Sequence, residues 1–341
     1  MLSEPSGPDQ AALEGLLRAE YGLTLPDLRR GPQGADSVAY LGEAEGRPYF
    51  VKAHDRRRPA NFGDLEQALG VVRHLGEQCR LACVPAVLTG ASGRLLQPLG
   101  DFAVAVFEYV SGPTLHEAPL DAAGQAALAQ VLARLHQGAG CPGLRVPAEA
   151  PFPQVYAQPL QRILAAADDL ARTGTDDQRR LSALLRRERT DLLQTLDRLD
   201  ALGRELRAVA PPVLTHGEPT ARNVLRAPAG RLVLVDWGEV ALGLPERDLT
   251  YFADQDLGPF LEAYAAAWPE PPRLSAAAFG YYAYRWAVSE VIDYGLRLLL
   301  ETPSAVEVAW AWSELPDYLP LPHAGIRASQ AEVAAELRRL A

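Results

Sequence analysis

One short stretch of this 341-residue chain gathers side chains that can do chemistry. It reads THGEPTARNVLRAPAGRLVLVDWGEV and contains Glu218, Asn223 and Asp236. Two apolar runs flank a Pro/Gly turn between Asn223 and Asp236, a pattern typical of a β-hairpin. We expect a hairpin of this length to bring Asn223 and Asp236 to the same end. Amide and carboxylate oxygens placed together there suit Mg²⁺, a hard cation.

Glu218 and Lys52 complete a set suited to phosphoryl transfer. Glu218 precedes Asn223 on the same loop, where its carboxylate could accept a proton from a hydroxyl group. Lys52 is the only lysine among 33 basic residues. Lysine offers a compact point charge that arginine cannot reproduce. A base, an Asn and an Asp near metal, and a lysine on a separate strand are the parts that phosphoryl transfer uses.

Composition excludes several other classes of protein. The 43 acidic residues outnumber the 33 basic ones and give a net charge of -10, which argues against nucleic acid as a partner and suits a cationic small molecule. No apolar run approaches the length of a membrane span, about 20 residues. The N-terminus, MLSEPSGPDQ, has no apolar core segment typical of a secretory signal. We expect a cytoplasmic protein, and no feature indicates its oligomeric state.

The cysteines predict no structural role. Cys79, Cys83 and Cys141 form an odd, sparse set without a CxxC pair. This pattern indicates reduced thiols that bind no metal. Cys79 and Cys83 are interpreted as buried or idle.

The first part of the chain favours a small, mostly antiparallel sheet with one main helix. Helices are expected at 9–21 and 62–77, and strands at 37–41, 48–53, 94–98 and 102–110. The later part is mainly helical around the β-rich stretch at 212–240. Its helices are expected at 121–138, 158–208, 257–268, 275–301 and 328–340. The chain is therefore predicted to be α+β, with a β-rich lobe over 1–110 and a larger helical lobe over 111–341.

The motifs resemble those of the aminoglycoside phosphotransferase and choline kinase-like family, in the protein-kinase-like superfamily. HGE-x4-N and the following DW are similar to the HGD-x4-N and IDW signatures of that family. Four further segments match in order: YFVK (49–52), FEYVSG (107–112), LARLHQ (132–137) and PERDLTYF (245–252). GADS (34–37) and the YR…YG segment (284–295) are most similar to the spectinomycin 9-phosphotransferase subgroup. The resemblance covers roughly residues 30–300 and implies a two-lobed protein-kinase-like fold.

The resemblance also implies a nucleotide site for ATP. Lys52 would contact the phosphates, together with Gly34 and Ser37 of the 31–37 loop, although that loop could equally be a plain hairpin turn. Glu66 is the preferred helix partner of Lys52, and Glu77 is its rival. The backbone of Glu108, Tyr109 and Val110 would hold the adenine.

The same resemblance assigns the reaction centre. Asn223 and Asp236 would hold Mg²⁺, and Glu218 would act as the base. His216 and Asp248 would support the catalytic loop. The family places Asp where this chain has Glu218, so the carboxylate here reaches one methylene further.

The acceptor is expected against the helical lobe, near the base. The candidate residues are Asp254, Arg285, Trp286, Glu290 and Asp293. Most residues of the 275–301 helix are better explained as amphipathic core packing. Glu290 and Asp293 are harder to explain in that way, because unpaired buried carboxylates are costly, and they could bind an amine.

The sequence therefore predicts an ATP- and Mg²⁺-dependent kinase that transfers the γ-phosphate to a hydroxyl of an aminoglycoside- or spectinomycin-like acceptor. An antibiotic acceptor would imply a role in antibiotic resistance. Homoserine, choline, methylthioribose or a sugar are alternative acceptors. A nucleotide-binding pseudokinase with a regulatory role is an alternative of another class, favoured only by Glu218.

Overall fold

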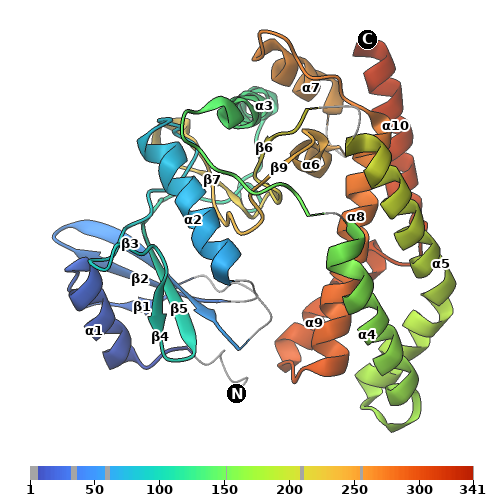
Figure 1. Ribbon diagram of the computed structural model, residues 1–341, viewed down its shortest axis with the longest axis horizontal. Coiled ribbons are helices and arrows are strands. Elements are labelled where there is room, and N and C mark those ends of the chain that lie inside the picture. The colour runs from blue at the N-terminus through green and yellow to red at the C-terminus, as the bar shows by residue number, and fades with distance from the viewer. Residues whose placement is uncertain are drawn as a thin grey trace.

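A computed structural model shows two lobes with different architectures (Figure 1). It describes residues 7–31, 37–57, 62–150, 152–207, 211–253 and 256–340. The N-terminal lobe is built on a five-stranded antiparallel sheet with the strand order β1-β2-β3-β5-β4. The strands are β1 (Arg29–Arg30), β2 (Ser37–Ala44), β3 (Arg47–Asp55), β4 (Gln97–Leu99) and β5 (Phe102–Glu108).

Helices cover both faces of this sheet. The apolar side of α1 (Gln10–Tyr21) packs Leu13 and Leu17 against Val51 and Val104. α2 (Phe62–Glu77) packs on the other face, where Ala103 and Ala105 point. The period-two alternation along β5 thus supplies both cores. Lys52 lies in β3, the middle strand, opposite Ala39 of β2 and Ala105 of β5.

The C-terminal lobe is mainly helical. Its α-helices are α3 (Ala122–Gln137), α4 (Phe152–Thr173), α5 (Asp176–Arg207), α6 (Glu246–Leu249), α7 (Leu257–Ala266), α8 (Ala276–Leu300), α9 (Ala305–Glu314) and α10 (Ala324–Leu340). Short 3-10 turns are η1 (Gly138–Gly140), η2 (Pro228–Gly230), η3 (Thr250–Phe252) and η4 (Leu315–Asp317). Two small antiparallel pairs join β6 (Val213–Thr215) with β9 (Ala241–Gly243), and β7 (Val224–Arg226) with β8 (Leu232–Leu234).

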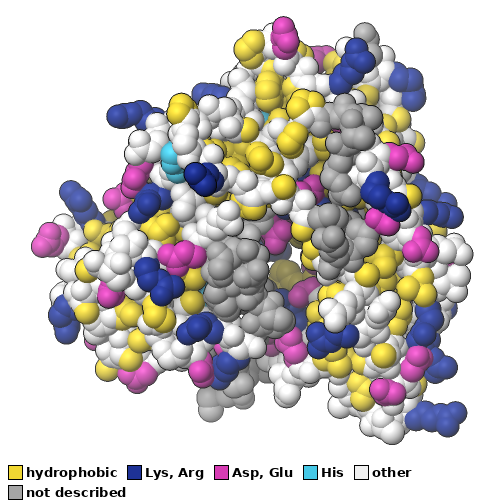
Figure 2. Space-filling model, in the orientation of Figure 1, with side chains coloured by type: hydrophobic (Ala, Val, Ile, Leu, Met, Phe, Trp, Pro, Cys, Tyr) yellow, Lys and Arg dark blue, Asp and Glu magenta, His cyan; other side chains and the backbone are white. Residues whose placement is uncertain are grey.

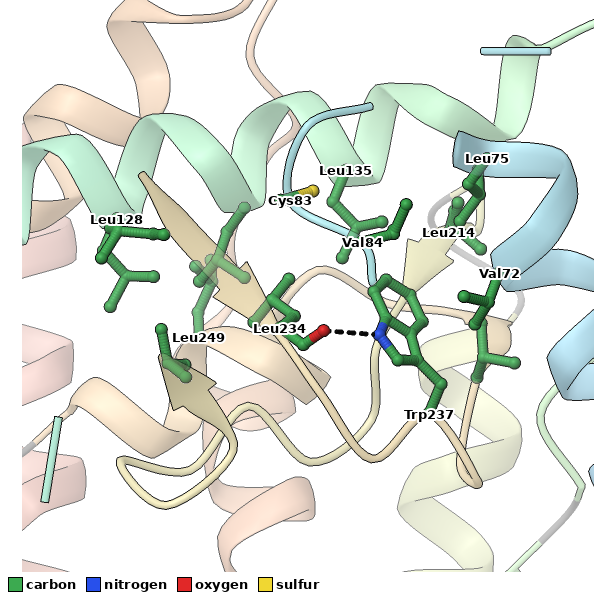
Figure 3. Close-up of a cluster of buried hydrophobic side chains, with 14 of the residues drawn as sticks. Val72, Leu75, Cys83, Val84, Leu128, Leu135, Leu214, Leu234, Trp237 and Leu249 are labelled. Carbon is green, nitrogen blue, oxygen red and sulfur yellow. Dashed lines mark hydrogen bonds between the residues drawn. The ribbon is translucent and has the colours of Figure 1, made fainter. Parts of the chain in front are cut away.

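One hydrophobic core runs from the N-terminal lobe into the helical lobe. Leu75 of α2, Leu135 of α3 and Leu234 of β8 belong to the same buried cluster, and Figure 3 shows Trp237 among these side chains. A second core joins α4, α5 and α8. The first core fixes the β7–β8 hairpin relative to the sheet that carries Lys52.

The α+β class and the two lobes are as predicted, and the main differences are local. The helical region expected at 158–208 is two helices, because the chain breaks at Gly174 and Thr175. β1, β9 and α9 were not expected. α9 begins with a capping box between Ser304 and Glu307, a signal that was present in the sequence. The division of the lobes after residue 110 stays a prediction.

The interpretation of the cysteines as reduced thiols was wrong for two of them. Cys79 and Cys141 form a disulfide across 62 residues of sequence. Sequence spacing gives no warning of such a pair, because only the fold brings α2 and α3 side by side. Cys83 is free and buried, and burial raises the pKa of its thiol to about 11.

No helix in the described ranges has the length and apolar character needed to cross a membrane.

Candidate active site

The contact between Lys52 and Asp236 joins the two lobes at the centre of the site. Lys52 Nζ donates to Asp236 Oδ1 at 2.8 Å, although the residues are 184 positions apart in the sequence. The side chain of Lys52 is 17% exposed and that of Asp236 is 51% exposed. The positive charge of Lys52 holds the pKa of Asp236 below its usual range. The carboxylate is therefore ionised and open to solvent on its other side.

The β7–β8 hairpin brings Asn223 and Asp236 together, as predicted. Val224 pairs with Leu234, and Val235 N donates to Asn223 O at 2.9 Å just beyond that pair. Asp236 has a φ of 63°, which is uncommon for a residue other than glycine. Trp237 Nε1 donates to Leu234 O at 2.8 Å, and the buried indole anchors the turn (Figure 3). Packing thus holds Asp236 in a backbone conformation that it would not adopt readily by itself.

A buried network positions the loop that carries Glu218. Asp248 Oδ2 accepts from His216 N at 2.8 Å, and Asp248 Oδ1 accepts from Gly217 N at 2.7 Å. His136 Nε2 lies 3.1 Å from the same carboxylate. Burial alone would raise the pKa of Asp248, but the hydrogen bond and charge of His136 lower it. Asp248 is therefore ionised and holds the loop through its hydrogen bonds to the two backbone amides.

His216 is a structural member of the loop in this geometry. Its Nε2 lies 3.0 Å from Val235 O, and its Nδ1 accepts from Glu218 N at 3.2 Å. These partners require a neutral ring with the proton on Nε2. Burial lowers the pKa of His216, which is consistent with the neutral form. The ring links the Glu218 loop to the strand end before Asp236.

Glu218 lies in an acidic, half-buried environment. Burial raises its pKa to about 8, with further increases from the charges of Asp236, Glu290 and Glu239. Lys52 opposes this shift. Glu218 thus shares this region with the acids Asp236, Glu239 and Glu290, while Lys52 lies beside Asp236, Arg247 beside Glu239, and Arg297 acts on Glu290. A bound cation would relieve their mutual repulsion and favour an ionised Glu218.

The residues present fit a hard metal ion. Asn223 Nδ2 donates to Glu218 O at 3.0 Å, so the side-chain oxygen of Asn223 points away from that contact. Lys52 occupies only Oδ1 of Asp236. One amide oxygen and one carboxylate oxygen therefore remain at the open end of the hairpin. Mg²⁺ binds through one or two protein oxygens plus phosphates and water, and this pair supplies them.

The predicted pairing of Lys52 with Glu66 was wrong in this structure. Glu66 Oε1 accepts from Leu95 N at 3.0 Å, and its other oxygen lies 3.6 Å from Arg94 Nη2. Lys52 pairs with Asp236 instead. Glu66 thus ties α2 to the segment before β4 rather than orienting the lysine. Local sequence could not distinguish these partners, because the acid that meets Lys52 depends on how β3 packs against α2 and against the end of the β7–β8 hairpin.

The remaining nucleotide-side candidates lie at the start of β2 and around the end of β5. Ser37 opens β2 and is buried, whereas Gly34 lies outside the described residues. Glu108 N donates to Ala86 O and Tyr109 N donates to Pro48 O, both at 3.0 Å. Of the three predicted adenine-binding residues, only Val110 keeps an amide without a described protein partner. The amides of Glu108 and Tyr109 are therefore already occupied by protein carbonyl groups.

Two of the predicted acceptor residues, Glu290 and Trp286, lie near the loop that carries Glu218. Glu290 of α8 is half-buried, and its charge acts on Glu218. Burial and the nearby Asp293 raise the pKa of Glu290 to about 7. Trp286 packs edge-on against Tyr251 at 5.3 Å, and Tyr251 OH donates to Gly217 O at 3.2 Å. Figure 2 shows the surface hollowed between the lobes, with acidic side chains at the margin.

The other acceptor candidates have different surroundings. Arg285 is buried, forms an ion pair with Glu149 and lies over the ring of Tyr156 at 5.7 Å. The guanidinium of Arg285 is therefore part of the buried packing of the helical lobe. The prediction that Arg285 binds the acceptor was wrong. Asp293 pairs with Arg297 at 2.8 Å on the same face of α8. Asp254 lies outside the described residues.

Sequence reasoning missed several residues that border the site. Glu239 acts on Glu218 from the segment after Trp237 and lies 3.4 Å from Arg247. The ring centroid of Trp310 in α9 lies 5.2 Å from the guanidinium carbon of Arg222, which follows Glu218 on the same loop, and 46% of Trp310 is exposed. Proximity to the WGE segment could have signalled Glu239. Trp310 was missed together with its helix.

Comparisons with known proteins agree with this geometry. The sequence model described as the phosphotransferase enzyme family matches residues 27–277. Protein StrN of Streptomyces griseus is 28% identical over 309 residues, covering 87% of this chain and 88% of StrN. A spectinomycin phosphotransferase solved with ADP and spectinomycin has a TM-score of 0.69 at 17% identity, covering 96% of this chain and 100% of that chain. A microcompartment-associated aminopropanol kinase has a TM-score of 0.60 at 17% identity, covering 98% of this chain and 100% of that one. The fold is therefore that of the protein-kinase-like phosphotransferases.

Proposed function

We propose that this chain, which belongs to the phosphotransferase enzyme family, transfers the γ-phosphate of ATP to a hydroxyl group of a small cationic molecule. Family membership makes it a small-molecule phosphotransferase. The nucleotide, the metal and the acceptor class are the parts that the proposal adds. The observation that carries it is the 2.8 Å contact between Lys52 and Asp236, with Asn223 at the same hairpin end.

Lys52 and the hairpin support ATP with Mg²⁺ as the phosphoryl donor. The Lys52 ammonium has three protons, so it can keep Asp236 while donating to a phosphate oxygen. Asn223 and Asp236 would hold Mg²⁺, which neutralises phosphate charge during transfer. Val110 N–H, just after β5, would donate a hydrogen bond to the adenine. The ADP and AMP bound to structural neighbours support the same choice of nucleotide.

Glu218 is proposed to orient and deprotonate the acceptor hydroxyl. The acceptor oxygen forms a bond to the γ-phosphorus, the bond to the β–γ bridging oxygen breaks, and the hydroxyl proton moves to the Glu218 carboxylate. Phosphoryl transfer through a loose transition state needs little early proton removal, so orientation is a large part of this role. The extra methylene of Glu relative to Asp is accommodated by the loop that His216 and Asp248 hold.

The acidic surroundings favour a cationic acceptor. Glu218, Glu239 and Glu290 repel one another, and burial raises the pKa of Glu218 and of Glu290 to about 8 and about 7. An ammonium group between them would lower both pKa values and would bind favourably. Spectinomycin, streptomycin and aminopropanol, which appear with the structural neighbours, are amines that also carry hydroxyl groups. An amine-bearing alcohol is therefore the substrate class that best suits this site.

A screen of acceptors tests the proposal. Purified protein is incubated with ATP and Mg²⁺ and with spectinomycin, streptomycin, choline, homoserine or aminopropanol, while ADP release and product mass are followed. We expect acceptor-dependent ADP and a product that has gained one phosphoryl group. The matched control is Asp236→Asn, which should give neither. Tight nucleotide binding without any phosphorylated acceptor would instead favour a pseudokinase.

A further inference from the structure

A disulfide bond between Cys79 and Cys141 joins the end of α2 to the helical lobe. Cys79 lies two residues after the end of α2, and Cys141 directly follows η1. Their Cα atoms are 6.0 Å apart. The intervening chain contains β4, β5, the connection between the lobes and α3. The disulfide therefore gives the two lobes a second covalent connection, in addition to the chain that runs from β5 to α3.

Hydrogen bonds on both sides of Cys79 in the chain strengthen this attachment. His74 Nε2 lies 3.0 Å from Pro142 O, next to the disulfide. Arg231 Nη1 donates to Ala82 O at 3.0 Å, and Leu234 N donates to Cys83 O at 2.8 Å. The 79–84 segment is thus fixed to β8, and β8 leads directly to Asp236.

The same segment is packed into the shared core. Cys83 and Val84 lie among Leu75 of α2, Leu135 of α3 and Leu234 of β8 (Figure 3). Cys79 itself packs against this cluster. Greater mobility of the chain at Cys79 would therefore be transmitted to β8, the strand that precedes Asp236.

We propose that the Cys79–Cys141 disulfide is a redox-sensitive tie that holds the 79–84 segment and β8 in place. Both cysteines are only half-buried, and Gln78, Arg80 and Pro142 beside them are exposed, so a small thiol can reach the bond. A dithiol reductant supplies two electrons and two protons. The S–S bond breaks to give two cysteine thiols, and the reductant becomes a cyclic disulfide. A cytosolic-type dithiol pool would open the tie, and an oxidising environment would keep it closed.

The first test counts thiols. Protein purified without reductant is denatured, alkylated and analysed by peptide mass. We expect alkylation at Cys83 alone, and at all three cysteines after reduction. His74, Cys79 and Cys141 could also hold a metal ion, since their ligand atoms lie within 4.8 Å of one another. Three alkylated cysteines before reduction, or a zinc ion bound to the free thiols, would overturn the proposal.

The second test measures what the tie does. Reduction should lower the Tm by about 5 °C, because the unfolded chain is no longer constrained. It should also speed hydrogen exchange at Leu234 N by at least about threefold, because that amide donates to the 79–84 segment. Cys83→Ala is the matched control, and its reduction should still lower the Tm and speed exchange at Leu234 N. In Cys79→Ser, which lacks the disulfide, the reductant should change neither the Tm nor the exchange rate. Unchanged exchange at Leu234 on reduction of the wild-type disulfide would refute the coupling, and this readout needs neither ATP nor an acceptor.

Discussion

Lys52 is proposed to have two partners, the carboxylate of Asp236 and a phosphate of the nucleotide. Its ammonium lies 2.8 Å from Asp236 Oδ1, and in the proposed site it would also donate to a phosphate of the nucleotide. An arginine there would carry the same charge but spread it over a planar fork. The solitary lysine in an arginine-rich chain is explained by this geometry.

Lys52→Arg should therefore fold normally and lose turnover. We expect a fall in kcat/KM for ATP of about tenfold to hundredfold, the loss of one charge-assisted contact. The measurement is coupled ADP release with an acceptor identified by the screen. Arg47→Lys, an exposed change on the same strand, is the control and should be neutral. Equal kinetics in a folded Lys52→Arg protein would remove Lys52 from the nucleotide site.

Glu246 is a buried acid that links stability to pH. Its Oε1 accepts from Ser275 N at 2.6 Å, and burial raises the pKa of Glu246 to about 7. The folded protein therefore holds this proton more tightly than the unfolded chain, and the contribution of Glu246 to stability declines as pH rises from about 4.5 to about 7. Glu246→Gln cannot titrate but can still accept the hydrogen bond.

We expect the wild type to lose about 2 kcal/mol of stability relative to Glu246→Gln when the pH is raised from about 5 to about 8. Urea denaturation at both pH values provides the measurement. Comparing the two proteins cancels the titration of all other groups. A difference that stays constant with pH would show that Glu246 is ionised alike in the folded and unfolded states.

At the scale of elements, local patterns predicted most of the helices but few of the partners. Apolar periodicity indicated α1, α2, α3 and α8, because each has one strongly buried side. The hairpin around Asn223 and Asp236 was predictable because its turn and both runs are continuous in sequence. The partner of Lys52, the disulfide and the buried pairing of Arg285 depend on which elements pack together, and local sequence does not encode that.

The β7–β8 hairpin should control the metal requirement. Asp236→Asn removes the formal charge facing Mg²⁺ and should abolish turnover at any practical Mg²⁺ concentration. Asn223→Ala should raise the Mg²⁺ concentration needed for half-maximal rate by about tenfold while leaving the Tm nearly unchanged. Magnesium titrations of the two variants give the readout. Wild-type Mg²⁺ dependence in both variants would contradict the metal assignment.

Across the whole molecule, the proposed reaction would place the nucleotide phosphates against the sheet lobe and the acceptor against the helical lobe. The shared core that contains Leu75, Leu135 and Leu234 holds these two halves in register. The family match ends at residue 277, so Glu290 and Trp310 lie beyond it. Acceptor choice is therefore expected to reside in the final helices of this chain.

Glu290→Gln tests that division between the halves. With an amine-bearing acceptor, we expect the acceptor KM to rise about tenfold or more and the KM for ATP to change little, because a charge-assisted contact is lost only on the acceptor side. Glu301→Gln is the matched control, because Glu301 is exposed at the end of the same helix and its change should leave both KM values unaltered. A loss shared equally by both KM values would place Glu290 outside acceptor binding.

The central claim is that Glu218 acts on the acceptor hydroxyl beside an ATP–Mg²⁺ site built from Lys52, Asn223 and Asp236. The most direct measurement compares wild type with Glu218→Gln in single-turnover phosphorylation of an acceptor, alongside Mg²⁺-dependent ATP binding. The account predicts nearly unchanged ATP binding and a rate lower by about 10²–10⁴-fold in the variant, with partial activity in Glu218→Asp. A Glu218→Gln protein that phosphorylates the acceptor as fast as the wild type would contradict it.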